Sequence, residues 1–144
     1  MEPDKFSECF TCWIDSLCTL TNGEVVAIDG KTARKSNDKN LGKRALHIVL
    51  AYATGNRLCL GQQCVDEKSN EITAIPQLLE LLLVKDCVIT IDAMGCQKTI
   101  AKKIIVKQAD YVLMVKGNQK TLLQQIEATF AETTLIQKIK STLI

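Results

Sequence analysis

The chain has 144 residues, of which 47% are hydrophobic and 24% charged, and its formal net charge is +2. This composition favours one globular domain and excludes an intrinsically disordered chain. No apolar run reaches the length of a membrane span, and the first residues lack the basic and apolar regions of a secretory signal. We therefore expect a cytoplasmic protein with no membrane partner.

The seven cysteines are expected to be free thiols, because an odd number without a secretory signal argues against a disulfide framework. Cys9 and Cys12 have the C-x-x-C spacing of some zinc and redox sites. A zinc site needs four ligands, however, and the single histidine, His47, belongs to another segment. We interpret both cysteines as small packing residues.

The N-terminal segment, residues 1–22, is expected to be a helical lead-in that ends at a turn over 21–23. Its apolar residues recur at three- and four-residue spacing: Phe6, Phe10, Trp13, Ile14 and Leu17.

Three strands are predicted after this helix. The first covers about 24–29 and is followed by a basic loop at 30–44. The second and third, at 45–53 and 57–65, are joined by a turn and are expected to pair as an antiparallel hairpin.

The second half of the sequence alternates helices with strands. The predicted elements are a helix from Thr73 with Pro76 in its first turn, a strand at 87–92, a helix at about 96–107, a strand at 110–115 and a helix marked by Leu122, Leu123, Ile126 and Phe130. The order β-β-β-α-β-α-β-α predicts an α/β fold with a mixed five-stranded sheet and helices on both faces. The main domain is expected at 23–133, followed by a tail at 134–144.

Two aspartates follow apolar strands. Asp29 comes at the end of "EVVAID" and Asp92 at the end of "VITID". Right-handed crossovers allow these strands to lie side by side and parallel, with both acids at the same carboxyl edge. Two carboxylates there repel each other unless a divalent cation binds them, and Mg²⁺ prefers such oxygens. The alternative is that each aspartate only caps a strand end or opens a turn.

The segment after Asp29 is rich in basic residues. Such a run is most often a solvated surface, but beside a metal site it is also suited to contact a DNA backbone. Both interpretations apply to four residues in particular: Lys31, Arg34, Lys35 and, after the strand at 110–115, Lys116.

Nucleotide-binding motifs are absent from this sequence. "GKT" at 30–32 is not a phosphate loop, because that motif needs glycine where Val25 stands, and no Gly-x-Gly-x-x-Gly follows either strand.

Three further polar residues have structural interpretations. His47 lies in an apolar strand and is expected to be a hydrogen-bonded core residue. Glu67 and Glu71 are expected to favour the dipole of the helix that follows them.

Four blocks of the sequence carry a resemblance to a known family. They are "VVAIDGKTAR", "LGQQCVDEKSNEITAIPQLLELL", "VITIDAMGCQKTIAKKI" and "ADYVLMVKGNQKTL". Over about Phe6 to Phe130 the chain resembles the DDE transposases of the H-repeat-associated insertion-sequence family, which are similar in fold to ribonuclease H and retroviral integrases.

The resemblance implies that Asp29 and Asp92 are the first two acids of a catalytic, metal-binding triad that uses Mg²⁺ or Mn²⁺. The implied reaction is hydrolysis of a DNA phosphodiester at the ends of the insertion sequence, after which the freed 3′-hydroxyl attacks target DNA. It also implies insertion-sequence ends and target DNA as partners, and self-association as a homo-oligomer.

The sequence departs from the family at the third acid, which the family carries in a Trp-x-x-Glu-Asn-type segment of a later block. Glu127 and Glu132 lie on the last predicted helix without that context. Simple ribonuclease H folds carry an acid on the helix after the fifth strand, so Glu127 is an alternative third acid. We therefore expect a truncated and inactive N-terminal piece of a transposase. The alternatives are a non-catalytic DNA-binding or regulatory fragment that associates with full-length transposase, and a decayed gene product without a selected function.

Overall fold

The computed structural model of the chain describes residues 2–17, 20–33, 36, 45–65 and 70–142. Its elements in chain order are α1 (Pro3–Leu17), β1 (Val25–Thr32), β2 (His47–Ala53), β3 (Leu58–Cys64), α2 (Glu71–Leu81), β4 (Val88–Ile91), the 3₁₀ helix η1 (Ala93–Gly95), α3 (Lys98–Val106), β5 (Asp110–Leu113), the 3₁₀ helix η2 (Gly117–Gln119) and α4 (Lys120–Thr142).

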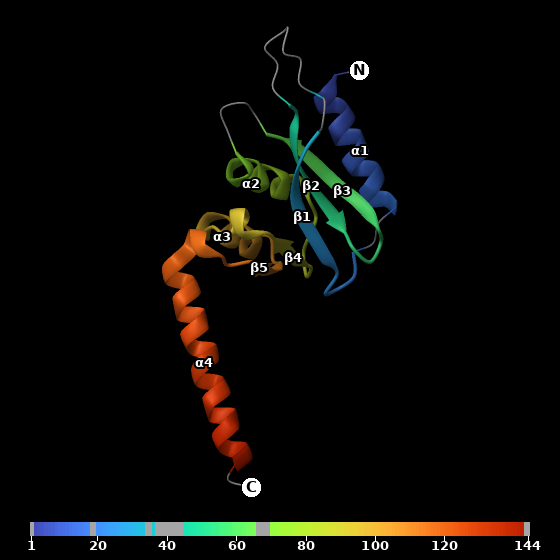
Figure 1. Cartoon of the computed structure of the whole chain (residues 1–144). Coiled ribbons are helices and arrows are strands. Elements are labelled where there is room, and N and C mark those ends of the chain that lie inside the picture. Colours follow the sequence, from blue (N-terminus) through green and yellow to red (C-terminus); the bar gives the residue numbers. More distant parts are fainter. Residues whose placement is uncertain (1, 18–19, 34–35, 37–44, 66–69, 143–144) are drawn as a thin grey trace.

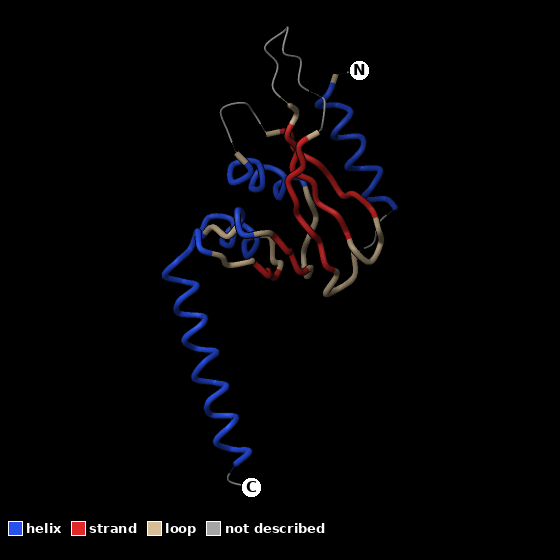
Figure 2. Tube along the Cα trace, viewed as in Figure 1, coloured by secondary structure: helices blue, strands red, loops and turns tan. Residues whose placement is uncertain are grey.

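The five strands form one mixed sheet in the order β3-β2-β1-β4-β5 (Figure 2). β1 pairs with β2, and β2 with β3, in antiparallel fashion, whereas β4 is parallel to both β1 and β5. The prediction that the first and fourth strands lie side by side and parallel in the centre is therefore confirmed. The sheet order and the interleaved helices make the fold RNase H-like, as expected.

Helices cover both faces of the sheet. Figure 1 shows α1 on one face and α2 with α3 on the other. The residues of β1 and β4 that alternate inward, Val26 and Ile28 in β1 and Ile89 in β4, pack in one core cluster with Leu78 and Leu79 of α2. Burial repeats at every second residue of these strands. Packing against α2 therefore fixes which residues of the two central strands face the core.

The first strand is longer than the sequence predicts. It extends to Thr32 because β2 offers an antiparallel partner beyond the point where the parallel pairing with β4 ends. Lys31 and Thr32 therefore belong to β1 and not to the basic loop. The rest of that loop, residues 34–35 and 37–44, lies outside the described residues.

The helix α2 begins two residues before the predicted start. The backbone N–H of Asn70 donates to the Oγ1 of Thr73 at 3.3 Å, which starts the helix at Glu71. The expectation that Pro76 lies in the first turn is therefore wrong, since Pro76 is the sixth residue of the helix. Its missing N–H removes one intrahelical hydrogen bond there.

The last helix, α4, leads away from the sheet instead of lying on a face (Figure 1). It continues to Thr142, across the boundary expected between 133 and 134. In the part of the chain that is described, no helix is long and apolar enough to cross a bilayer. In that part of the chain, the free thiols are Cys9, Cys12, Cys59, Cys64 and Cys96.

Candidate functional site

The two candidate acids occupy equivalent positions on neighbouring strands. Ile28 of β1 is paired with Ile91 of β4, and this is the last pair of the parallel ladder. Asp29 is the next residue of β1, Asp92 is the first residue after β4, and both are exposed. The sheet therefore brings the two aspartates to the same edge, at the carboxyl end of β4.

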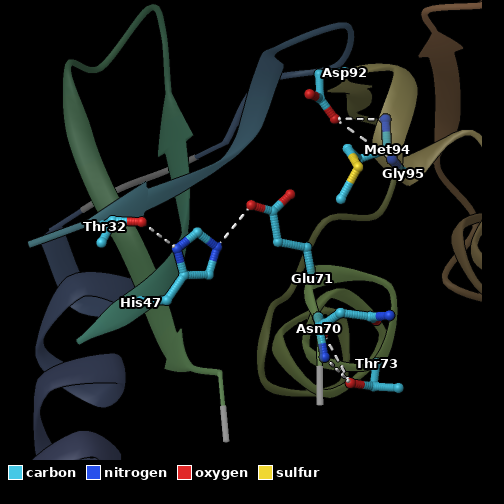
Figure 3. Close-up of polar contacts among 8 residues, drawn as sticks. All are labelled: Thr32, His47, Asn70, Glu71, Thr73, Asp92, Met94 and Gly95. Atoms are coloured by element: carbon cyan, nitrogen blue, oxygen red, sulfur yellow. Dashed lines mark hydrogen bonds and ion pairs between the residues drawn. The ribbon is translucent and has the colours of Figure 1, made fainter. Parts of the chain in front are cut away.

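Asp92 has a structural role at this edge. Its Oδ1 accepts hydrogen bonds from the backbone N–H groups of Met94 at 3.0 Å and Gly95 at 3.4 Å, so the side chain caps η1 (Figure 3). The cap fixes the direction of the carboxylate. The other oxygen, Oδ2, accepts no hydrogen bond from the described residues.

Asp29 has no comparable role. It lies within β1 opposite Leu50 of β2, so it neither ends the strand nor opens a turn. Its carboxylate has no hydrogen bond or ion pair with any other described residue. The alternative interpretation, in which each acid only serves local structure, therefore accounts for Asp92 but leaves Asp29 unexplained.

The donors fit a hard divalent cation. Two exposed carboxylates on one edge supply the oxygen ligands that Mg²⁺ and Mn²⁺ take, and both ions usually keep waters in their remaining positions. Nitrogen or sulfur ligands do not complete the site, because the described residues contain no cluster of three or more His, Cys, Asp or Glu side chains arranged to hold a metal.

The later acids are not brought to this edge. Glu127 and Glu132 belong to α4, which leads away from the sheet (Figure 1). Neither of them forms a metal-ligating group of three with the two aspartates in the described part of the chain. The structure thus places two of the predicted acids together and leaves the later ones apart.

Two of the four basic candidates can be located, and both are exposed. Lys31 is the second residue after Asp29 on β1, and Lys116 immediately precedes η2. The η2 turn is tied to η1, because Asn118 Nδ2 donates to the carbonyl of Ala93 at 2.7 Å. Lys116 is therefore held next to the turn that Asp92 caps. The other two candidates, Arg34 and Lys35, lie outside the described residues.

Hydrogen bonds among three side chains connect the sheet to α2 beside this edge. The Oγ1 of Thr32 is 2.8 Å from His47 Nδ1, and His47 Nε2 is 2.7 Å from the Oε1 of Glu71 (Figure 3). Because an ionised carboxylate only accepts hydrogen bonds, Nε2 donates to Glu71, and the Thr32 hydroxyl, which can donate or accept, pairs with Nδ1. The expectation that His47 is hydrogen-bonded is confirmed, but the expectation that it is a core residue is wrong, because 29% of its side chain is exposed.

Glu71 does more than the sequence suggested. It is the first residue of α2, as its expected effect on the helix dipole requires, but its carboxylate turns toward the sheet, and its side chain is only 17% exposed. A Cβ built on Gly30 would meet its Oε1. Glu71 thus places a third carboxylate against the strand residue next to Asp29. The sequence signal for this contact was Gly30 directly after Asp29, because a glycine permits another group to approach the backbone closely.

The comparison with known proteins agrees with this architecture. The profile of the family described as "Transposase DDE domain" matches residues 20–143. The chain belongs to the DDE transposase family.

Three relatives of this DDE transposase chain are proteins of Escherichia coli K12. It is 53% identical over 125 residues to "Putative transposase YncI", covering 87% of the chain and 50% of that protein. It is 48% identical over 130 residues to "H repeat-associated putative transposase YhhI", covering 90% of the chain and 34% of that protein. It is 47% identical over 128 residues to "H repeat-associated putative transposase YbfD", covering 89% of the chain and 51% of that protein. The chain thus spans between a third and a half of the length of these relatives.

Among solved structures, the chain is similar to a piggyBac transposase in a synaptic complex with hairpin DNA. The TM-score is 0.49 at 14% sequence identity, and the match covers 70% of this chain and 25% of the transposase.

Proposed function

We propose that the edge carrying Asp29 and Asp92 is the divalent-metal site of a DNA-processing transposase domain. The observation that carries this proposal is the register of β1 and β4, in which both aspartates follow the last parallel pair, Ile28 and Ile91. Membership of the DDE transposase family supports it. Mg²⁺ is the expected ion, and Mn²⁺ is expected to substitute for it.

The roles of the residues follow from their positions. Asp29 and Asp92 hold the ion, and the N–H groups of Met94 and Gly95 keep the Asp92 carboxylate oriented for it. A bound divalent ion polarises a phosphoryl oxygen and stabilises the charge that develops during phosphodiester cleavage. The structural cap on Asp92 thus also serves the proposed site.

DNA is the proposed substrate. Lys31 and Lys116 are exposed, and both neighbour the segments that carry the two acids, so we assign them to contacts with phosphate groups. Arg34 and Lys35 are included in this proposal on their sequence positions alone. Recognition of insertion-sequence ends, transfer to target DNA and self-association are proposed for the full-length protein of this family.

The metal site is tested by titrating the purified chain with Mn²⁺ in a calorimeter. Asp29→Asn and Asp92→Asn remove the ligand charge with little change of shape, and we expect each to weaken binding and the double variant to abolish it. Asp110→Asn is the matched control, because Asp110 is exposed at the amino end of β5, opposite the proposed site. Binding that is unchanged in the double variant would refute the proposed site.

A second candidate function is a DNA-binding fragment without catalysis that associates with full-length transposase. The observation that favours it is that no third metal-ligating side chain joins Asp29 and Asp92 among the described residues. A nicking assay on DNA carrying insertion-sequence ends, with Mg²⁺ or Mn²⁺, separates the two functions. Cleavage that is lost in Asp29→Asn supports the enzyme, whereas DNA binding without cleavage supports the fragment.

A further inference from the structure

Glu71 lies beside the proposed metal site and is held in place between His47 and β1. Its Oε1 is 2.7 Å from His47 Nε2, and the same oxygen would be 2.0 Å from a Cβ on Gly30. His47 is in turn held by Thr32, its cross-strand partner in the pairing of β1 with β2. The carboxylate is therefore locked against β1 at the residue that follows Asp29.

The geometry makes Glu71 unsuited to be a direct ligand alongside the two aspartates. Successive residues of a strand point to opposite faces, so the side of Gly30 that Glu71 fills is not the side from which Asp29 projects. The described residues also contain no group of three side chains placed to hold a metal. An effect of Glu71 on the site must therefore act through its charge.

We propose that Glu71 tunes the metal site electrostatically: its fixed negative charge strengthens the binding of a divalent cation by Asp29 and Asp92. This inference rests on the proposed function. Figure 3 shows the Glu71 carboxylate between the His47 ring and the turn that Asp92 caps. At 17% exposure the charge is only partly screened by water, so its field reaches a cation at the neighbouring strand ends.

Two substitutions separate charge from hydrogen bonding. Glu71→Gln keeps the shape and the oxygen that accepts from His47 but removes the charge. Glu71→Asp keeps the charge but is too short to preserve the 2.7 Å contact. If the charge acts, Mn²⁺ affinity falls on the order of 3- to 10-fold in Glu71→Gln at low salt and changes less in Glu71→Asp. A purely structural role predicts the reverse order.

The matched control is Glu24→Gln. Glu24 lies just before the amino end of β1 and accepts a hydrogen bond from the backbone N–H of Gly55 at 2.6 Å. The variant removes the same charge from the other end of the same strand, so the net charge of the protein changes equally. We expect its Mn²⁺ affinity to match that of the unmodified chain.

The measurement is Mn²⁺ titration by calorimetry at low and high NaCl, with melting temperatures recorded without metal. Of the two glutamine variants, only Glu71→Gln is expected to bind Mn²⁺ more weakly than the unmodified chain. This difference in affinity should be smaller at high salt, and the melting temperatures should be unchanged. Full affinity in Glu71→Gln, while Asp29→Asn loses binding, would overturn this inference and leave the proposed site intact. Loss of binding as complete as in Asp29→Asn would make Glu71 a ligand and also overturn it. Unchanged binding in Asp29→Asn/Asp92→Asn would refute the proposed site itself.

Discussion

The carboxylate of Glu71 occupies the space in which a side chain at Gly30 would begin. A Cβ at residue 30 would lie 2.0 Å from Oε1 and 2.4 Å from the carboxyl carbon. The absence of a side chain at residue 30 is thus what allows α2 to bring a glutamate onto the sheet beside Asp29.

Gly30→Ala is therefore expected to displace Glu71 and break its contact with His47. Because Glu71 is a flexible side chain, it rotates away, and the cost is the lost hydrogen bond plus residual crowding, about 1–3 kcal/mol of unfolding free energy. Urea unfolding measures this. In a Glu71→Ala background the same substitution meets no carboxylate, and its cost should be smaller. Equal costs in the two backgrounds would show that the two residues do not compete for this space.

Asp92 combines a cap and a proposed ligand, and two substitutions should separate them. Asp92→Ala removes the acceptor for Met94 and Gly95 and should destabilise the protein by about 0.5–2 kcal/mol. Asp92→Asn keeps a side-chain oxygen in this position and should cost less. We expect both variants to lose Mn²⁺ affinity, and comparable stability losses would contradict the assigned cap.

Gly95 should tolerate no side chain, because it packs directly against the strand that leads to Asp92. A Cβ there would lie 2.2 Å from Ile91 Cγ2 and 3.3 Å from Ile75 Cδ1. Gly95→Ala should therefore cost about 1–3 kcal/mol or more through overpacking. Gly117→Ala is the control, since nothing lies within 4 Å of its Cβ position. A similar melting temperature for the two variants would contradict the packing described around η1.

Two adjacent leucines that directly follow α2, Leu82 and Leu83, test the position of the core. Leu82 is 3% exposed and belongs to the core cluster, whereas Leu83 is 72% exposed. Leu82→Ala should cost about 2–5 kcal/mol through lost burial and a residual cavity. Leu83→Ala should remain within about 0.5 kcal/mol of the unmodified chain. Chemical unfolding of both variants measures this difference, and the reverse order would mean that Leu83 and not Leu82 is buried in the core after α2.

The sequence is sufficient to predict the centre of the sheet. The apolar runs before Asp29 and Asp92 and the handedness of crossovers allow the two strands to be parallel neighbours, and the pairing of Ile28 with Ile91 confirms this arrangement. The end of β1 is less predictable from sequence, since Gly30 is typical of a turn. Gly30 instead leaves room for the carboxylate of Glu71. That role depends on a contact between residues 41 positions apart in the chain.

The link from Glu71 to His47 is missed for the same reason. At the start of a helix, a glutamate is already explained by the dipole, so its sequence position gives no cause to look further. Which way the carboxylate turns depends on how α2 packs on the sheet, and that is a tertiary property. Periodicity and turn signals report only local structure.

The proposed DNA contacts can be tested through their salt dependence. If Lys31 and Lys116 each neutralise one phosphate, Lys31→Gln and Lys116→Gln should each weaken binding of DNA and lower the slope of log K against log salt concentration by about 1. Lys85→Gln is the control, because Lys85 is exposed near the amino end of β4, away from Asp92. Fluorescence anisotropy with labelled duplex DNA at several salt concentrations measures the slope. Equal slopes for all three variants would remove Lys31 and Lys116 from the interface, because a contact that releases no counterion is not a phosphate contact.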